Sequence, residues 1–168
     1  MCIRDSYLTD LVDYASKRQL KIGSTQTKEK EILGANNKEE LAVLYKSLVA
    51  LNVEEAKKKG TVFKDEATCY VEGNLKVGKD VRIGSNVTIK GDVKIGNDVS
   101  IESNVVLANV NIGDNSVIRD FCSVEDSTIA KNVEVGPFAR LRDGVVLDDS
   151  AKVGNFVEIK KSKIGEGS

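Results

Sequence analysis

The stretch that decides the fold runs from Val71 to Leu107 and reads VEGNLKVGKDVRIGSNVTIKGDVKIGNDVSIESNVVL. An aliphatic residue returns at every sixth position, and the spacing continues to Ile164 with three steps shortened by one residue. A period of six fits neither an amphipathic helix nor the alternation of a hairpin strand. It is typical of the hexapeptide repeat, in which three hexads form one triangular coil of a parallel β-helix.

This spacing assigns the residues that should point into the coil. They are Val71, Val77, Ile83, Ile89, Ile95, Ile101, Leu107, Ile112, Ile118, Val124, Ile129, Val135, Leu141, Leu147, Val153, Ile159 and Ile164. A smaller apolar residue four positions later, such as Val81 or Cys122, should fill a corner. Because one coil cannot bury its own apolar residues, stability must come from successive coils stacked about 4.8 Å apart.

The composition argues against several classes of function. The 168 residues have 25 basic and 26 acidic side chains, so no basic surplus is available for nucleic acid or an anionic membrane. No apolar run approaches the roughly 18 residues of a membrane span. The three cysteines are odd in number and widely spaced, which favours reduced thiols. We therefore expect a cytoplasmic protein that binds neither nucleic acid nor membranes.

The chain has no histidine, and this restricts its chemistry. Histidine-ligated zinc sites and Ser–His or Cys–His catalytic pairs are excluded. The γ-class carbonic anhydrases, β-helix proteins that hold zinc with histidines, are excluded with them. Acyl transfer to an amine commonly uses histidine as the general base near neutral pH. The sequence therefore predicts either an incomplete catalyst or a general base that lies outside these 168 residues.

The first sixty residues follow a different pattern. Residues 7–17 have apolar residues at helical spacing, and residues 21–25 are compatible with a short strand. A long helix is predicted over residues 38–59, with Asn37 as N-cap, Glu40 completing a capping box and Gly60 following its C-terminal end. Along one side of this helix we expect an apolar stripe formed by Leu41, Leu44, Tyr45, Leu48 and Leu51.

Three strings carry a resemblance to a known family. They are YLTDLV (7–12), EILGANNKEEL (31–41) and GPFARLRDGVVLDDSAKVGNFVEIKKSKIGEGS (136–168). They resemble the bacterial bifunctional uridyltransferase–acetyltransferases that make UDP-N-acetylglucosamine, and the resemblance covers residues 7–168. It implies a mainly β chain. Residues 1–37 would be the α/β tail of a nucleotidyltransferase domain, residues 38–60 a linker helix, and residues 61–168 a left-handed β-helix acetyltransferase domain. Residues 1–6 do not fit, and we interpret them as a spurious start.

The resemblance also implies substrates, partners and site residues. Such enzymes are homotrimers that transfer an acetyl group from acetyl-CoA to glucosamine-1-phosphate, in a groove between subunits. They then transfer uridylyl from UTP to N-acetylglucosamine-1-phosphate with Mg²⁺. Arg142 and Lys160 would bind the sugar phosphate or UDP-N-acetylglucosamine, and Asn36 would bind the nucleotide sugar and Mg²⁺ in the uridyltransferase site. The catalytic histidine would follow Ser168, so we expect a fragment in which neither site is complete.

The repeat supports the pairing of Arg142 and Lys160 independently. Each follows an inward position, and they are eighteen residues apart with no shortened step between them. They should therefore lie side by side, one coil apart, and two unpaired cations so close would suit a phosphate. The alternative is that both are ordinary solvated turn residues, as Lys90 on the same edge would be.

Other interpretations also stay open from the residues alone. Asn36 precedes a predicted helix, where asparagine commonly serves as a cap or turn residue. Two rival functions remain for the whole chain. One is a non-catalytic structural β-helix protein, and the other is a sugar-nucleotide pyrophosphorylase whose β-helix serves only for oligomerisation.

Overall fold

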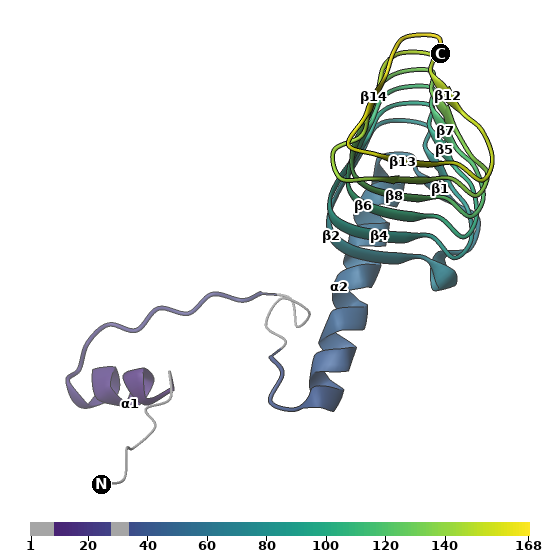
Figure 1. Cartoon of the computed structure of the whole chain (residues 1–168). Coiled ribbons are helices and arrows are strands. Elements are labelled where there is room, and N and C mark those ends of the chain that lie inside the picture. The colour runs from purple at the N-terminus through teal and green to yellow at the C-terminus, as the bar shows by residue number, and fades with distance from the viewer. Residues whose placement is uncertain (1–8, 28–33) are drawn as a thin grey trace, which may run out of the picture.

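A computed structural model describes residues 9–27 and 34–168. Predictions for residues 1–6, and those parts of the strings 7–12 and 31–41 that fall on residues 7–8 and 31–33, lie outside the described residues. Over the described ranges the chain is mainly β, with strands that wind into a solenoid (Figure 1). Helix α1 (Asp10–Lys17), helix α2 (Lys38–Lys58) and the short 3-10 helix η2 (Glu66–Thr68) precede most of the strands.

Parallel strands form the three sides of the solenoid. The first side contains β1 (Val62–Phe63), β3 (Arg82–Ile83), β5 (Ser100–Ile101), β7 (Val117–Ile118), β9 (Glu134–Val135) and β12 (Lys152–Val153). The second contains β2 (Tyr70–Val77), β4 (Thr88–Ile95), β6 (Val106–Ile112), β8 (Ser123–Ile129), β10 (Arg140–Arg142) and β13 (Glu158–Lys160). Strands β2, β4, β6 and β8 continue onto the third side, which β11 (Val146–Leu147) and β14 (Lys163–Ile164) extend. All the pairings are parallel, as the hexads predict.

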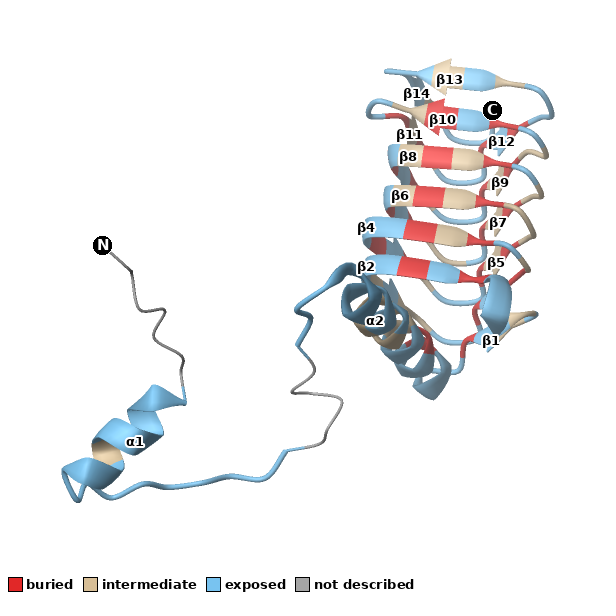
Figure 2. Cartoon of the chain, turned by 90° about the horizontal axis from the view of Figure 1, so that it is seen from below, coloured by how far each residue is buried: buried red, intermediate tan, exposed pale blue. Residues whose placement is uncertain are grey.

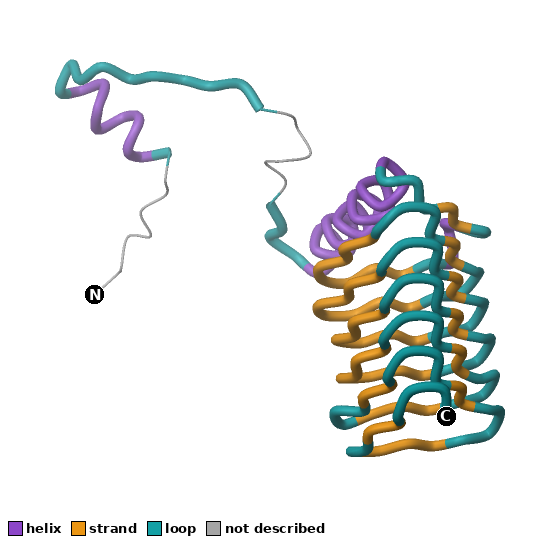
Figure 3. The backbone as a smooth tube through the Cα atoms, turned by 90° about the horizontal axis from the view of Figure 1, so that it is seen from above, coloured by secondary structure: helices purple, strands orange, loops and turns teal. Residues whose placement is uncertain are grey.

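The register follows the spacing of the sequence. Ile83 lies beside Ile101, eighteen residues on, whereas Leu107 lies beside Val124, only seventeen residues on. The shortened steps remove a residue from the corner between the second and third sides, where Asn109, Asp126 and Lys161 take left-handed φ values of 53°, 45° and 47°. The coils consequently stay stacked, although the repeat is irregular (Figure 3).

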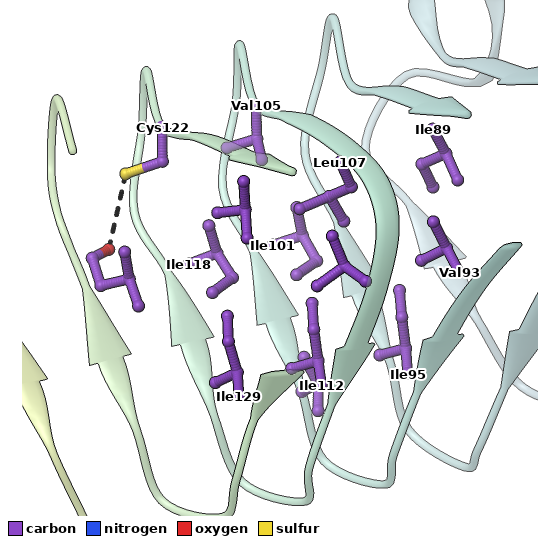
Figure 4. Packing of buried hydrophobic residues seen from close by; sticks show 14 of the residues in the cluster. Ile89, Val93, Ile95, Ile101, Val105, Leu107, Ile112, Ile118, Cys122 and Ile129 are labelled. Atoms are coloured by element: carbon purple, nitrogen blue, oxygen red, sulfur yellow. Dashed lines mark hydrogen bonds between the residues drawn. The ribbon is translucent and has the colours of Figure 1, made fainter. Parts of the chain in front are cut away.

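The predicted inward positions form the core of the solenoid. Each of the seventeen is buried except Val77, Ile159 and Ile164, which are partly buried against the same core. Figure 4 shows the aliphatic side chains meeting inside the coils. Cys122 fills a corner as predicted: it is 1% exposed, and its Sγ lies 3.6 Å from the Val135 carbonyl oxygen. Burial raises the pKa of this thiol above its ordinary value.

Helix α2 begins and ends as the capping residues predict. The Oδ1 of Asn37 accepts a hydrogen bond from the N–H of Glu40 at 2.8 Å, and Gly60 follows the helix with a φ of 92°. The C-terminal half of α2 packs against the first coil (Figure 2). There Asn52 donates hydrogen bonds to the carbonyl oxygens of Val71 and Gly73, at 3.3 Å each. The helix therefore covers the open end of the stack.

Three leucines of the predicted apolar stripe are exposed on this helix. Leu41, Leu48 and Leu51 are 55%, 52% and 41% exposed, and the buried residues of α2 are Val53 and Ala56. Tyr45, another member of the stripe, does meet the solenoid, because its ring centroid lies 5.6 Å from that of Tyr70. The remaining contacts with the first coil come from Asn52, Val53 and Ala56 in the C-terminal half of the helix, and the three leucines face away from them.

The segment before α2 contains the predicted helix but not the predicted strand. Helix α1 spans Asp10–Lys17 and has no buried residues. Residues 21–25 form no strand and pair with none of the strands in the described part of the chain. Within the ranges described, neither helix is long and apolar enough to cross a membrane.

Candidate functional site

Strands β10 and β13 bring Arg142 and Lys160 together. The two strands pair in parallel, with Arg140 opposite Glu158, Leu141 opposite Ile159 and Arg142 opposite Lys160. Leu141 is completely buried, so alternation along the strand turns Arg140 and Arg142 outward. The predicted adjacency of the two cations is therefore confirmed in the fold.

Carboxylates accompany these cations, and the five residues Arg140, Arg142, Asp143, Glu158 and Lys160 are called the Arg142 cluster below. The Nε of Arg142 donates to Glu158 Oε1 at 2.7 Å, and its Nη1 donates to Asp143 Oδ2 at 3.0 Å. Lys160 Nζ lies 3.5 Å from the same Asp143 oxygen, and Arg140 Nη1 lies 3.9 Å from Glu158 Oε1. Three cations and two carboxylates leave one net positive charge.

The electrostatics of the cluster follow from these contacts. The hydrogen bond from Arg142 holds the pKa of the Glu158 carboxyl below its ordinary value. In return, that hydrogen bond to Glu158 raises the pKa of the Arg142 guanidinium. The Arg142 side chain is 28% exposed and that of Lys160 is 46% exposed, so both face solvent. The cluster is an accessible, charged surface on two adjacent coils.

The sequence-based picture of two unpaired cations was wrong. Both cations are paired, because Glu158 faces outward on the same strand as Lys160 and Asp143 follows Arg142 directly. These two carboxylates were missed as members of the site. Applying the coil period of eighteen residues to positions 140–160 would have placed Glu158 opposite Arg140 and beside Arg142.

Lys90 lies in the same row of outward residues, as expected. It is opposite Glu72 in the coil before and Ala108 in the coil after, and Ala108 is opposite Glu125. Arg142 belongs to the coil that follows Glu125, because Leu141 pairs with Val124. Lys90 is therefore three coils from Arg142. It occupies the equivalent outward position of its own coil, but its neighbours are Glu72 and Ala108 rather than the residues of the Arg142 cluster.

The structure does not bring Asn36 to this site. Its backbone N–H and its side-chain Nδ2 both donate to Glu40 Oε2, at 2.7 and 3.2 Å. The Nδ2 of Asn37 donates to the other oxygen of Glu40 at 2.9 Å. The N–H of Asn36 is the main cause that lowers the pKa of the Glu40 carboxyl. Asn36 thus takes part in capping α2.

The residues described around Asn36 do not by themselves supply a Mg²⁺ site. An amide oxygen is an acceptable ligand, but Mg²⁺ in proteins is usually held by one or two carboxylates together with phosphates. The carboxylate near Asn36, Glu40, already accepts hydrogen bonds from both asparagines. Across residues 9–27 and 34–168 no three His, Cys, Asp or Glu residues gather in a way that could hold a metal ion.

Comparisons with known proteins match the solenoid and the segment before it. The family model described as the EIF2B subunit epsilon LbH domain matches residues 55–166. The bifunctional protein GlmU of Chromobacterium violaceum is 39% identical over 163 residues, which are 96% of this chain and 36% of that protein. The bifunctional protein GlmU of Neisseria meningitidis serogroup A is 40% identical over the same shares of the two chains. The chain spans about a third of the length of these curated relatives.

Proposed function

This chain belongs to the LbH, or left-handed β-helix, domain family, and we propose that its solenoid binds the sugar phosphate of a GlmU-type acetyltransferase. The reaction is acetyl transfer from acetyl-CoA to the amine of glucosamine-1-phosphate. The other half of such an enzyme transfers uridylyl from UTP to the product. We propose that the protein works as a homotrimer. We also propose a cytoplasmic location, because the odd number and wide spacing of its cysteines favour reduced thiols.

One observation carries the proposal, namely the register that sets Arg142 beside Lys160 on β10 and β13. A phosphate monoester carries nearly two negative charges and several strong acceptor oxygens, and it is recognised by adjacent Arg and Lys donors. The contacts of Arg142 use Nε and Nη1, which leaves Nη2 for a phosphate oxygen. Among the described residues, Lys160 Nζ has one ion-pair contact, the longer one to Asp143, and the side chain can turn toward a ligand.

The carboxylates of the cluster then have two effects on a bound phosphate. Glu158 and Asp143 fix the plane of the Arg142 guanidinium, which reduces the conformational freedom that binding would otherwise remove. They also repel the phosphate, which weakens binding. The chain's described residues therefore bind and orient the sugar phosphate. They do not supply the general base, because the chain has no imidazole that could take the proton from the attacking amine.

A role for Asn36 toward UDP-N-acetylglucosamine and Mg²⁺ is a separate proposal. The contacts with Glu40 use its N–H and Nδ2, so the amide oxygen Oδ1 is the atom it would offer. The carboxylate ligands would have to come from residues other than those around it. Substitution of Asn36 by Ala should reduce Mg²⁺-dependent uridylyl transfer in a full-length relative while leaving acetyl transfer unchanged.

A second candidate function is favoured by the ion pairs themselves. If Arg142 and Lys160 only compensate Glu158 and Asp143, the cluster is a solvated surface of a structural β-helix protein. The two candidates differ in one measurable respect. A phosphate site binds sugar phosphates at a defined position, whereas a compensated surface attracts all anions weakly.

Titration of the isotopically labelled chain followed by NMR distinguishes these possibilities. Glucosamine-1-phosphate should shift the backbone signals of residues 140–143 and 158–161 in a saturable manner. Glucosamine without phosphate, and inorganic phosphate alone, serve as matched ligands that each lack one part of the substrate. Saturable shifts confined to β10 and β13 support the proposal, and shifts spread evenly over the basic residues of the solenoid contradict it.

A further inference from the structure

A groove on the first side of the solenoid is separate from the Arg142 cluster. It has a volume of about 520 Å³ and lies over β1, β3 and β5, on the side of the solenoid where Figure 2 labels β1 and β5. Its polar lining residues are Lys64, Arg82, Ser100, Glu102, Ser103 and Asp120. The groove is called the first-side groove below, and its size is within the range of small-molecule sites.

Alternation along the strands turns the lining residues outward. Phe63, Ile83 and Ile101 point into the core, so the residues on either side of each of them face solvent. The preceding residues form one outward row, in which successive coils place Val62, Arg82 and Ser100 opposite one another. The following residues form a second outward row, which consists of Lys64, Gly84 and Glu102.

Gly84 produces the hollow in the second row. A Cβ built there would lie 2.6 Å from the carbonyl carbon of Glu102 and 2.7 Å from the nitrogen of Ser103, so a larger residue does not fit between the coils. Lys64 on one side of this position and Glu102 on the other consequently have no side chain between them. The close stacking of the coils requires the glycine, and the groove follows from it.

Two cations at one end of the groove have no partner. Neither the Lys64 ammonium nor the Arg82 guanidinium makes a hydrogen bond or an ion pair with the residues in the ranges 9–27 and 34–168. By contrast, the Arg119 guanidinium on the fourth coil contacts both Glu102 and Glu134, at 3.1 and 2.6 Å. Unpartnered charges of one sign in a concave surface attract a ligand of the opposite sign. The groove therefore favours an anion at the end that Lys64 and Arg82 form.

The carboxylates at the other end of the groove already accept hydrogen bonds. One oxygen of Glu102 accepts from Arg119 Nη1 at 3.1 Å, and the other accepts from the N–H of Asp120 at 3.1 Å. Asp120 Oδ1 accepts from the N–H of Ser103 at 2.9 Å, which leaves Oδ2 to accept from a ligand. The groove consequently has a cationic end and an acceptor end, and the hydroxyl of Ser100 lies on the coil between Arg82 and Asp120.

We propose that the first-side groove binds a small molecule that carries a diphosphate group. Lys64 and Arg82 lie one coil apart and in different outward rows, so they stand diagonally and each can hold a separate anionic group. A diphosphate offers one such group to each cation, whereas a single phosphate bridges them only if both side chains converge. The Ser100 hydroxyl donates to a phosphate oxygen, and Asp120 accepts from a hydroxyl or amine elsewhere in the molecule. This second anion site lies on another side of the solenoid from Arg142 and is not needed for the proposed function.

An NMR titration of the isotopically labelled 168-residue chain with inorganic pyrophosphate tests this site. The backbone signals of residues 64, 82–84 and 100–103 should shift in a saturable manner. Inorganic phosphate, with one anionic group, and succinate, with two carboxylates but no phosphorus, are the matched ligands at equal ionic strength. Both should bind in the groove at least about tenfold more weakly than pyrophosphate. Glucosamine-1-phosphate, which also has one anionic group, should not saturate the groove.

Charge variants locate the binding on the two cations. Lys64→Ala and Arg82→Ala should each weaken pyrophosphate binding in the groove by about tenfold or more, because a charge-assisted hydrogen bond is lost. Lys152→Ala is the matched control and should leave binding unchanged, because Lys152 is an exposed cation in the same outward row as Arg82, four coils further on. The spectrum of each variant reports its folding, and Arg82→Gln replaces Arg82→Ala should that variant unfold.

The possible failures of this site and of the proposed function are distinguishable. No saturable shift in the groove, an equal affinity for succinate or inorganic phosphate, or equal weakening by Lys152→Ala overturns the diphosphate site. These results leave the proposed function intact, because binding of glucosamine-1-phosphate at β10 and β13 is read from different signals. Pyrophosphate shifts confined to residues 140–143 and 158–161 also overturn the groove, and they make the Arg142 cluster the anion site of this chain.

Discussion

A methyl group added at Gly73 should meet the backbone of the next coil. A Cβ built there lies 2.8 Å from the Gly91 nitrogen and still closer to the Gly91 carbonyl oxygen, below the separation that real Cβ atoms show. Gly73 also has a φ of 112°, which L-residues rarely adopt. The conformational strain costs roughly 1–2 kcal/mol, and the forced shift of packed backbone costs about 1–3 kcal/mol more. Gly73→Ala should therefore destabilise the chain by about 2–5 kcal/mol.

Two other glycines separate these contributions. Gly144 has a φ of 84°, but a Cβ there meets no atom within 4 Å, so Gly144→Ala should show the strain alone, about 1–2 kcal/mol. Gly154 has neither a positive φ nor a neighbour within 4 Å. Gly154→Ala should be neutral or stabilise by about 0.4–1 kcal/mol, since alanine restricts the unfolded chain.

Urea unfolding followed by circular dichroism measures the three free energies. The order of destabilisation should be Gly73→Ala, then Gly144→Ala, then Gly154→Ala. Equal costs at Gly73 and Gly144 would show that the coils do not approach closely at Gly73, and the reasoning would then be refuted.

Three further predictions concern stability, pH and catalysis. Thr61→Val should be neutral or stabilise by up to about 1 kcal/mol in the same unfolding assay, because the buried Thr61 Oγ1 has no hydrogen-bond partner among residues 9–27 and 34–168. Stability should be constant between about pH 6 and 8, since the chain has no histidine to titrate there. Stability should fall below about pH 4. The N–H of Asn97 lowers the pKa of the Asp114 carboxyl, and the hydrogen bond from Arg142 lowers that of Glu158, in each case below the value in the unfolded chain. The stability that these two carboxylates contribute is therefore lost as the pH drops through their folded pKa values. Incubation of the chain with acetyl-CoA and glucosamine-1-phosphate should give no product above the uncatalysed rate, and robust turnover would contradict the assignment of binding without a general base.

The solenoid was predictable from the sequence because its physics is periodic. Each inward aliphatic residue occupies the same place in a hexad, and stacking is the only way to bury such a repeat. The three shortened steps were visible as well, and the structure absorbs each of them at one corner. Helix α2 was predictable for a local reason, because Asn37, Glu40 and Gly60 supply the two ends of the helix within a few residues of each end.

Contacts between coils were harder to predict. The adjacency of Arg142 and Lys160 followed from counting residues, but their pairing with Glu158 and Asp143 depends on rotamers that no period specifies. The ring stack of Phe121, Phe138 and Phe156 was detectable in principle, because these residues are 17 and 18 residues apart, as one coil requires. It was missed because none of the three occupies an inward position of the repeat. The apolar stripe of α2 was predictable from helical spacing, but spacing does not say what covers a stripe, and its leucines are exposed.

The central claim is that Arg142 and Lys160 together bind the phosphate of a sugar substrate, and calorimetric titration of charge variants with glucosamine-1-phosphate tests it most directly. Arg142→Ala and Lys160→Ala should each weaken binding by about tenfold to a hundredfold, because a charge-assisted hydrogen bond is lost. Lys90→Ala, in the same row but three coils away, should have no effect, and all three variants should stay folded because these side chains leave the core. Equal, modest losses in all three variants, or no loss in any, would contradict the claim and leave the cluster a solvated surface.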